Sequence, residues 1–284
     1  MRWQPARRPV APRGRRKKSH VESRKSKARR TNRSTGFSLY DSCRLLIAVV
    51  RSLATYVAVS LYVLVAAPLG MTLAILFGAK DFLYKLGHWG VRLSMGLSGI
   101  TFRVAGREHV PVDRAVVFCS NHQSNVDPPI LFEALHSHTH ILFKAELEAI
   151  PLLARAFKVG GFIPVDRRNK EAAMRSIEAG AKSIRSGNSF LIFPEGTRSK
   201  TAQLLPFKKG GFIMAIKAQA PILPVAVQGG DAAMQKGSKI IRPATVSIRI
   251  GEPIETAGLA LTDRDALIAK TRQRIEGLLA LGPV

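Results

Sequence analysis

The chain has 284 residues, of which 44 are Lys or Arg and 19 are Asp or Glu, so its formal net charge is +25. Its hydrophobic content of 46% is too high for a chain that is disordered throughout. Two cysteines, Cys43 and Cys119, exclude a disulfide scaffold and a four-cysteine zinc site. The length suits one catalytic domain of roughly 200 residues with an additional segment.

The first segment, residues 1–34, contains 14 Lys and Arg and one acid, Glu22, and therefore carries +13. Because it has almost no apolar periodicity, we predict a disordered polybasic arm over residues 1–36. Such a run can neutralise the phosphates of nucleic acid. It can equally be a solvated arm, or a charge cluster that orients a neighbouring membrane segment.

Residues 52–79 follow this arm closely and contain no charged residue. An uncharged, mostly apolar run of this length predicts a membrane segment. Pro68 and Gly70 interrupt it, so we expect a helical hairpin over residues 44–98 that bends there and dips into one leaflet. The arm would then meet anionic lipids on the same side as the rest of the chain. A single span, with the helix extended back to Leu45, is the alternative.

Beyond residue 98, short β-branched or aromatic runs alternate with helical patterns, which predicts an α/β domain over residues 99–284. We expect a largely parallel or mixed sheet of about seven strands that is covered by helices. The expected strands are 100–104, 115–119, 140–144, 161–165, 189–193, 222–227 and 245–250. A helix over Lys170–Arg185 is expected to bury Ala173, Met174, Ile177, Ala181 and Ile184.

The last helix is expected to begin near Thr262 and Asp265, which have the spacing of a capping box. Its predicted buried residues are Leu267, Ile268, Ile275 and Leu278. Ligands of parallel sheets gather at the carboxyl ends of the strands. The unusual residues of this chain fall at such positions, in three segments.

The first segment is NHQSNVDPP, residues 121–129. A carboxylate at Asp127 that accepts the Nδ1–H of His122 would fix the imidazole tautomer and leave Nε2 free to accept a proton. Such an imidazole can deprotonate a hydroxyl as it attacks a carbonyl, without a covalent enzyme intermediate. Asp127 is alternatively a helix N-cap, because Pro128 suits the first helical position. The two roles are compatible, since a carboxylate has several acceptor sites.

The second segment is GFIPVDR, residues 161–167. Its Arg167 emerges at a strand end, where a guanidinium can bind phosphate through two parallel hydrogen bonds. The alternative is a surface arginine that pairs with Asp166.

The third segment is FPEGTRS, residues 193–199. Arg198 offers a second cation, Glu195 can position that arginine or a substrate hydroxyl, and Gly196 lets the backbone approach a ligand closely. Taken alone, this segment also fits an ordinary turn with a salt bridge.

Together these segments and a later PILPVAV, residues 221–227, occur in the order and rough spacing of the four blocks of the glycerophospholipid acyltransferases. Within that family the chain most closely resembles the 1-acyl-sn-glycerol-3-phosphate acyltransferases, over about residues 90–255. KAEL, residues 144–147, and PFKKGGF, residues 206–212, are also similar to family segments. The polybasic arm is not part of the shared pattern.

The resemblance implies transfer of a fatty acyl group from acyl-CoA or acyl carrier protein to the sn-2 hydroxyl of lysophosphatidic acid, which gives phosphatidic acid for phospholipid biosynthesis. It implies that His122 is the general base and that Asp127 orients it. It further implies that the acceptor phosphate is held by several residues, namely Lys144, Arg167 and Arg198, in a pocket shaped by Glu195 and Gly196. The expected location is a membrane, either the cytoplasmic face of a bacterial inner membrane or an organelle envelope.

Other features are expected to be structural. The triplet His136, His138 and His140 lacks an HExxH pattern or a nearby cysteine, so we expect a polar loop and no metal. Cys119 is expected in the core, and the paired glycines match no nucleotide fingerprint, so no cofactor is expected. Two rival functions stay open: an acyltransferase for glycerol-3-phosphate or another lysophospholipid, and a membrane-tethered nucleic-acid binder, which would use the arm but none of the three segments.

Overall fold

The computed structural model describes residues 39–284 except 136–137, 200 and 202. The predicted arm over residues 1–36 and His136 lie outside the described residues. Residues Cys43–Val284 form one structural unit, and the description below concerns this unit.

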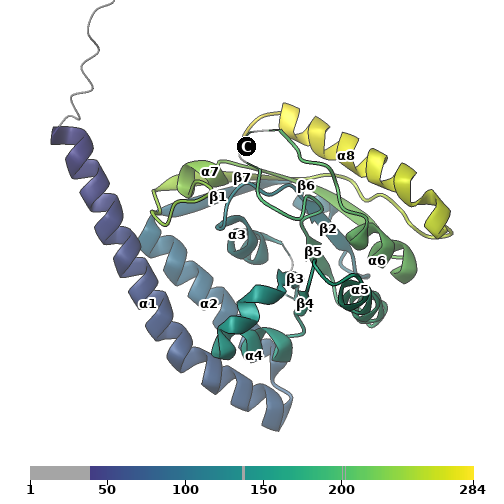
Figure 1. Ribbon diagram of the computed structural model, residues 1–284, viewed down its shortest axis with the longest axis horizontal. Helices are drawn as coiled ribbons and strands as arrows, with labels where there is room; N and C mark the ends of the chain where they lie inside the picture. Colours follow the sequence, from purple (N-terminus) through teal and green to yellow (C-terminus); the bar gives the residue numbers. More distant parts are fainter. Residues whose placement is uncertain (1–38, 136–137, 200, 202) are drawn as a thin grey trace, which may run out of the picture. The chain divides into compact units, whose positions relative to one another are not determined.

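The unit begins with two long helices, α1 (Leu39–Phe77) and α2 (Lys80–Ser98), that lie side by side and run in opposite directions (Figure 1). The Tyr62 hydroxyl donates to the Leu86 carbonyl at 2.8 Å and fixes this pairing. Among the described helices, α1 is the one long and apolar enough to cross a membrane, over Ser42–Phe77.

The bend of this hairpin is not where the sequence predicted it. Helix α1 continues through Pro68 and Gly70 and ends before Gly78, which has φ +68°. Gly70 serves close packing: a Cβ there would lie 2.8 Å from the side chains of Leu83 and Leu86 on α2. The packing of α1 against α2 therefore compensates for the backbone hydrogen bond that Pro68 cannot make, and α1 stays helical there. The turn between the helices is made at Gly78, whose left-handed conformation favours glycine.

The remaining chain forms a seven-stranded sheet of order β1-β7-β6-β2-β5-β3-β4, in which only the β6–β7 pair is antiparallel. The strands are β1 (Ile100–Ala105), β2 (Val117–Ser120), β3 (His140–Lys144), β4 (Ile163–Val165), β5 (Phe190–Ile192), β6 (Ile222–Gln228) and β7 (Ala244–Ile250). The predicted α/β fold and all seven predicted strands are confirmed, with shifts of up to two residues at their ends.

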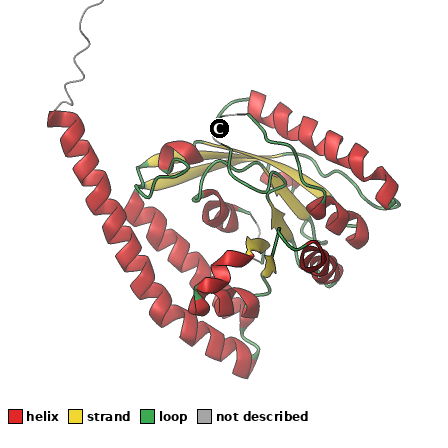
Figure 2. Ribbon diagram, viewed as in Figure 1, coloured by secondary structure: helices red, strands yellow, loops and turns green. Residues whose placement is uncertain are grey.

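Helices cover both faces of this sheet (Figure 2). One face packs against α3 and the end of α2, and the other against α5, α6 and α8. Alternation along β2 divides the core: Phe118 points into the first layer, and Val117 and Cys119 into the second. The helices of the domain are α3 (Asp127–Ala134), α4 (Pro151–Val159), α5 (Lys170–Arg185), α6 (Gly210–Ala218), α7 (Gly230–Ala233) and α8 (Arg264–Ala280), with short turns η3 (Arg107–His109), η4 (Ala145–Ala149) and η5 (Leu261–Asp263).

Two details of the helix predictions are wrong. Met174 on α5 is 40% exposed, because the buried stripe of that helix passes through Gly180 instead. Thr262 and Asp265 do not cap α8. The Asp263 carboxylate accepts the Ala260 N–H at 2.8 Å, and Asp265 pairs with Arg264 at 2.9 Å.

Candidate active site

The carboxyl ends of β2, β4, β5 and β6 lie at one edge of the sheet, because these strands run parallel to one another. Residues 121–129 follow β2, Arg167 follows β4, residues 193–199 follow β5, and residues 229–241 follow β6. The fold therefore gathers the three predicted segments, as the sequence implied, and adds a fourth that it did not indicate.

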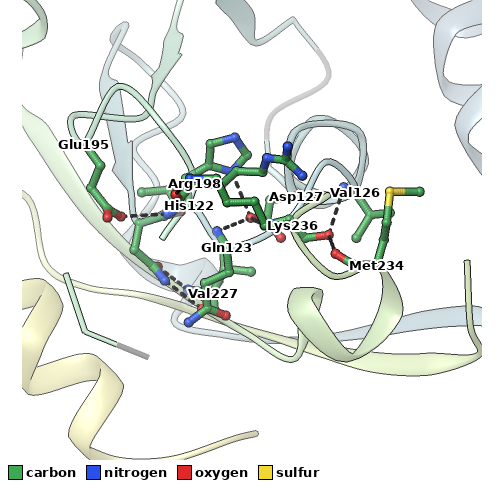
Figure 3. Close-up of polar contacts among 12 residues, drawn as sticks. His122, Gln123, Val126, Asp127, Glu195, Arg198, Val227, Met234 and Lys236 are labelled. Carbon is green, nitrogen blue, oxygen red and sulfur yellow. Dashed lines mark hydrogen bonds and ion pairs between the residues drawn. The ribbon is translucent and has the colours of Figure 1, made fainter. Parts of the chain in front are cut away.

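At this edge, His122 and Asp127 form a hydrogen-bonded pair (Figure 3). His122 Nδ1 lies 2.9 Å from Oδ2 of Asp127, whose side chain is fully buried. The same oxygen accepts the N–H groups of Gln123 and Ser124, each at 2.7 Å. These three bonds fix the carboxylate as an acceptor, so Nδ1 carries the proton. Nε2 has no hydrogen-bond partner among the described residues, and it is left to act as a base.

Asp127 does not act as the helix cap that the sequence also allowed. Although it is the first residue of α3, its carboxylate bonds N–H groups of residues 123 and 124, which precede the helix. A Cβ on Gly230, at the start of α7, would lie 2.1 Å from the other carboxylate oxygen of Asp127. Glycine at 230 therefore allows α7 to pack directly against the buried carboxylate.

Glu195 positions the backbone of His122. Its two carboxylate oxygens accept the N–H groups of His122 and Leu205, each at 2.9 Å, and the residue is 2% exposed. Burial raises the pKa of the Glu195 carboxyl, although these two hydrogen bonds act in the opposite direction. The Ser199 N–H also donates to the His122 carbonyl at 2.8 Å. Glu195 thus joins the first and third segments, whereas the sequence suggested contact with Arg198 or with a substrate hydroxyl.

Two residues that the sequence argument did not single out complete the support of His122. The Phe193 ring stacks on the imidazole, with centroids 4.2 Å apart. The Asn121 side chain donates to the Val227 carbonyl at 2.9 Å and accepts the Val227 N–H at 2.7 Å. Both residues lie inside the quoted motifs. The sequence could have pointed to Asn121 because it directly precedes His122, and to Phe193 because it follows the end of β5.

The arginines of the second and third segments are brought together at the loop that follows β5. Arg167 donates from Nη1 to the Gly196 carbonyl, so the alternative pairing with Asp166 is not formed. Gly196 has φ +70°, a conformation that favours glycine. Arg198 has a buried Nη1 atom without a hydrogen-bond partner among the described residues. Lys144 is not joined to this group by any described contact, and its ammonium pairs with Glu146 at 3.0 Å.

An apolar cavity of about 410 Å³ lies on the side of α3 that faces the hairpin. Its wall includes Pro128 and Pro129, which directly follow Asp127, and Phe132 on the same helix. Tyr62 and Gly90 contribute from α1 and α2. The cavity therefore lies between the hairpin, α3 and α4.

The features expected to be structural lie outside this group. Cys119 is fully buried, as predicted. His138 pairs with Asp81 at 3.0 Å, and His140 packs among aromatic rings that include Phe162 and Phe190. Within the described ranges, no three His, Cys, Asp or Glu side chains are arranged to hold a metal ion.

Comparisons with known proteins show what the chain is similar to. Residues 101–228 match the family model described as Acyltransferase. The chain is 36% identical over 171 residues to a Cocos nucifera 1-acyl-sn-glycerol-3-phosphate acyltransferase, covering 60% of this chain and 55% of that protein. It is 33% identical over 181 residues to human 1-acyl-sn-glycerol-3-phosphate acyltransferase beta, covering 63% of this chain and 65% of that one. The chain thus spans between half and two thirds of the length of these relatives.

The fold is also similar to a solved structure, that of the 1-acyl-sn-glycerophosphate acyltransferase PlsC from Thermotoga maritima. The TM-score is 0.72 at 24% sequence identity, over 84% of this chain and 98% of the other. This likeness supports the fold, and it includes a larger part of the chain than the family model does.

Proposed function

We propose that the protein is a member of the acyltransferase family, whose model residues 101–228 match, and that it transfers a fatty acyl group from a thioester to the sn-2 hydroxyl of 1-acyl-sn-glycerol-3-phosphate. The product is phosphatidic acid. The observation that carries the proposal is the His122–Asp127 pair, whose Nε2 has no partner among the described residues. Arg167 and Arg198 come from segments that follow β4 and β5 of the same sheet.

In the proposed reaction, His122 Nε2 removes the proton of the acceptor hydroxyl as its oxygen attacks the thioester carbonyl carbon. The Asp127 carboxylate stabilises the imidazolium that forms, because it already accepts the Nδ1–H at 2.9 Å. The tetrahedral intermediate then collapses with cleavage of the carbon–sulfur bond. The leaving thiolate takes the proton from Nε2, which restores the neutral imidazole.

Arg167 and Arg198 are proposed to hold the phosphate of the acceptor. The Arg198 Nη1 atom is buried with no partner among the described residues, and neither arginine forms an ion pair with a described carboxylate. A dianionic phosphate would supply the missing acceptors. Fixing it there would hold the sn-2 hydroxyl near Nε2, and positioning of this kind supplies a large part of the rate in such reactions.

The proposal includes a lipid-facing hairpin. Large apolar side chains on α1 and α2 are exposed, among them Leu61, Val65, Phe77 and Trp89. Near the middle of α1, Tyr56 donates to the Lys239 carbonyl at 2.8 Å, so this part of the helix stays with the domain. These contacts favour a hairpin that dips into one leaflet over a single span. We place it at the cytoplasmic face of a bacterial inner membrane or in an organelle envelope, where anionic lipids would attract the basic chain.

The acyl donor is proposed to be acyl-CoA or acylated carrier protein, and no cofactor takes part. An acceptor other than lysophosphatidic acid is the second candidate, because the cations recognise a phosphate without measuring the size of the head group. Glycerol-3-phosphate and other lysophospholipids belong to this class.

The test is an acyl-transfer assay of purified full-length protein with lysophosphatidate, glycerol-3-phosphate and lysophosphatidylcholine. Lysophosphatidate should be the preferred acceptor. His122→Ala should abolish transfer while the protein stays folded, and Arg198→Ala should mainly raise the KM for the acceptor. His138→Ala removes a partly exposed histidine elsewhere and serves as the control. Near-normal turnover by His122→Ala would overturn the assignment of the base.

A further inference from the structure

The segment that follows β6, residues 229–241, brings another cation to the arginines. Lys236 Nζ donates to the Arg198 carbonyl at 2.6 Å and lies 3.5 Å from the Thr197 hydroxyl (Figure 3). This lysine lies beyond residue 228, where the family match ends. In the part of the chain that the structure describes, it forms no ion pair with a carboxylate. We infer that Lys236 is a further phosphate-binding residue and helps to select acceptors that carry a phosphate monoester.

The backbone around Lys236 is fixed from two sides. The buried Ser124 hydroxyl donates to the Met234 carbonyl at 2.7 Å, which ties the segment to the loop between His122 and Asp127. On the other side, the Ile241 N–H donates to the Ser52 hydroxyl of α1 at 2.8 Å. Lys236 is half-buried between these anchors. These two hydrogen bonds therefore hold the backbone that positions Lys236 relative to Arg198.

The hydrogen bonds of Lys236 leave donor capacity for a ligand. An ammonium has three N–H donors. Two of them are directed at the Arg198 carbonyl and the Thr197 hydroxyl, and the third is not used by a described residue. The two buried carboxylates of the site are bonded to other groups, Asp127 to His122 and Glu195 to two backbone N–H groups. A phosphate monoester carries close to two negative charges at neutral pH, so a further cation stabilises it more than it stabilises a singly charged phosphodiester.

This inference rests on the proposed function, and the test separates the two. The KM for lysophosphatidate, the KM for the acyl thioester and kcat are measured for full-length wild type, Lys236→Met, Lys236→Arg and Lys239→Met. Lys239 is exposed on the same segment, so its replacement removes the same charge without touching Arg198. We expect Lys236→Met to raise the KM for lysophosphatidate about tenfold, as loss of one charge-assisted hydrogen bond would. The KM for the thioester should stay within about twofold, and Lys236→Arg should restore most of the loss.

Three outcomes contradict this account: two overturn the inference about Lys236, and the third overturns the proposed function. Equal KM values for Lys236→Met and Lys239→Met would overturn the inference while the function stands. A fall in kcat and in melting temperature that Lys236→Arg does not rescue would show that Lys236 only supports the loop, which also overturns it. If wild type transfers no acyl group to lysophosphatidate, the proposed function fails. Calorimetric binding of glycerol-3-phosphate to the same variants then decides on Lys236: weaker binding by Lys236→Met alone supports its role in binding phosphate, and equal binding refutes it.

Discussion

A methyl group at Gly230 should disable the site without altering any residue that touches substrate. A Cβ there would lie 2.1 Å from the Asp127 carboxylate oxygen and 3.1 Å from Ser124 Cβ, whereas ordinary contacts begin at 3.4 Å. Asp127 Oδ2 is held by three hydrogen bonds. The carboxylate or the start of α7 must therefore move by about 1 Å, and displacements of that size in an active site reduce rates by about 100-fold.

We expect Gly230→Ala to lower kcat by about this factor and to cost about 1–3 kcal/mol of unfolding free energy, as overpacking of a tight interior does. The KM for the acceptor should change less, because Arg167 and Arg198 belong to other segments and Lys236 lies beyond the end of α7. Initial rates and melting curves of the detergent-solubilised protein measure both effects. Gly277→Ala on α8 is the matched control: its Cβ would meet nothing within 4 Å, and it should be neutral or stabilising by about 0.5–1 kcal/mol. A folded Gly230→Ala protein with wild-type kcat would refute this account of how Asp127 is held.

Three other changes test further parts of the structure. Burial lowers the pKa of His140 to about 4. The unfolded state therefore binds a proton on this imidazole more tightly than the folded state does. The free energy of unfolding should fall by up to about 3 kcal/mol as pH drops from about 6.5 towards 4. Thermal unfolding of His140→Phe should lack this component, and equal pH dependence in both proteins would contradict it. Glu195→Gln keeps only one acceptor oxygen for two backbone N–H groups. It should lower the free energy of unfolding by about 1–3 kcal/mol and should also lower kcat. An unchanged melting temperature would show that the carboxylate does not hold these two backbone groups. Ser52→Ala removes the acceptor for the Ile241 N–H and should speed hydrogen exchange in residues 229–241, and unchanged exchange would mean that α1 does not fix this segment.

The sheet and the grouping of the motifs were predictable because both follow from local patterns. The seven strands are short apolar runs, and residues that follow parallel strands must meet at one edge. The bend of the hairpin was not predictable, because whether Pro68 ends a helix depends on a partner helix. Here Gly70 lets α2 approach closely, and this contact belongs to the tertiary structure.

The pairing of His122 with Asp127 was predictable, and the contacts of the other candidate residues were less so. The His122–Asp127 bond follows from spacing across a turn, and it is present at 2.9 Å. Glu195 was expected to position Arg198 or a substrate hydroxyl. A buried carboxylate is stable only with hydrogen-bond donors, and here the donors are two backbone N–H groups. Lys236 lies in a loop without a motif, so only the folded chain could reveal that it contacts Arg198.

The base and the cations form one assembly, because the same backbone groups hold both. The His122 N–H donates to the Glu195 carboxylate, and the His122 carbonyl accepts the Ser199 N–H. Glu195 and Ser199 lie on either side of Arg198 in the sequence, so the loop that carries this arginine also holds the backbone of His122. Lys236 closes this loop from the opposite side through the Arg198 carbonyl. A substitution that shifts residues 195–199 should therefore change acceptor binding and proton transfer together, whereas Arg198→Ala, which removes only a side chain, should separate them. That contrast distinguishes a rigid site from a set of independently placed residues.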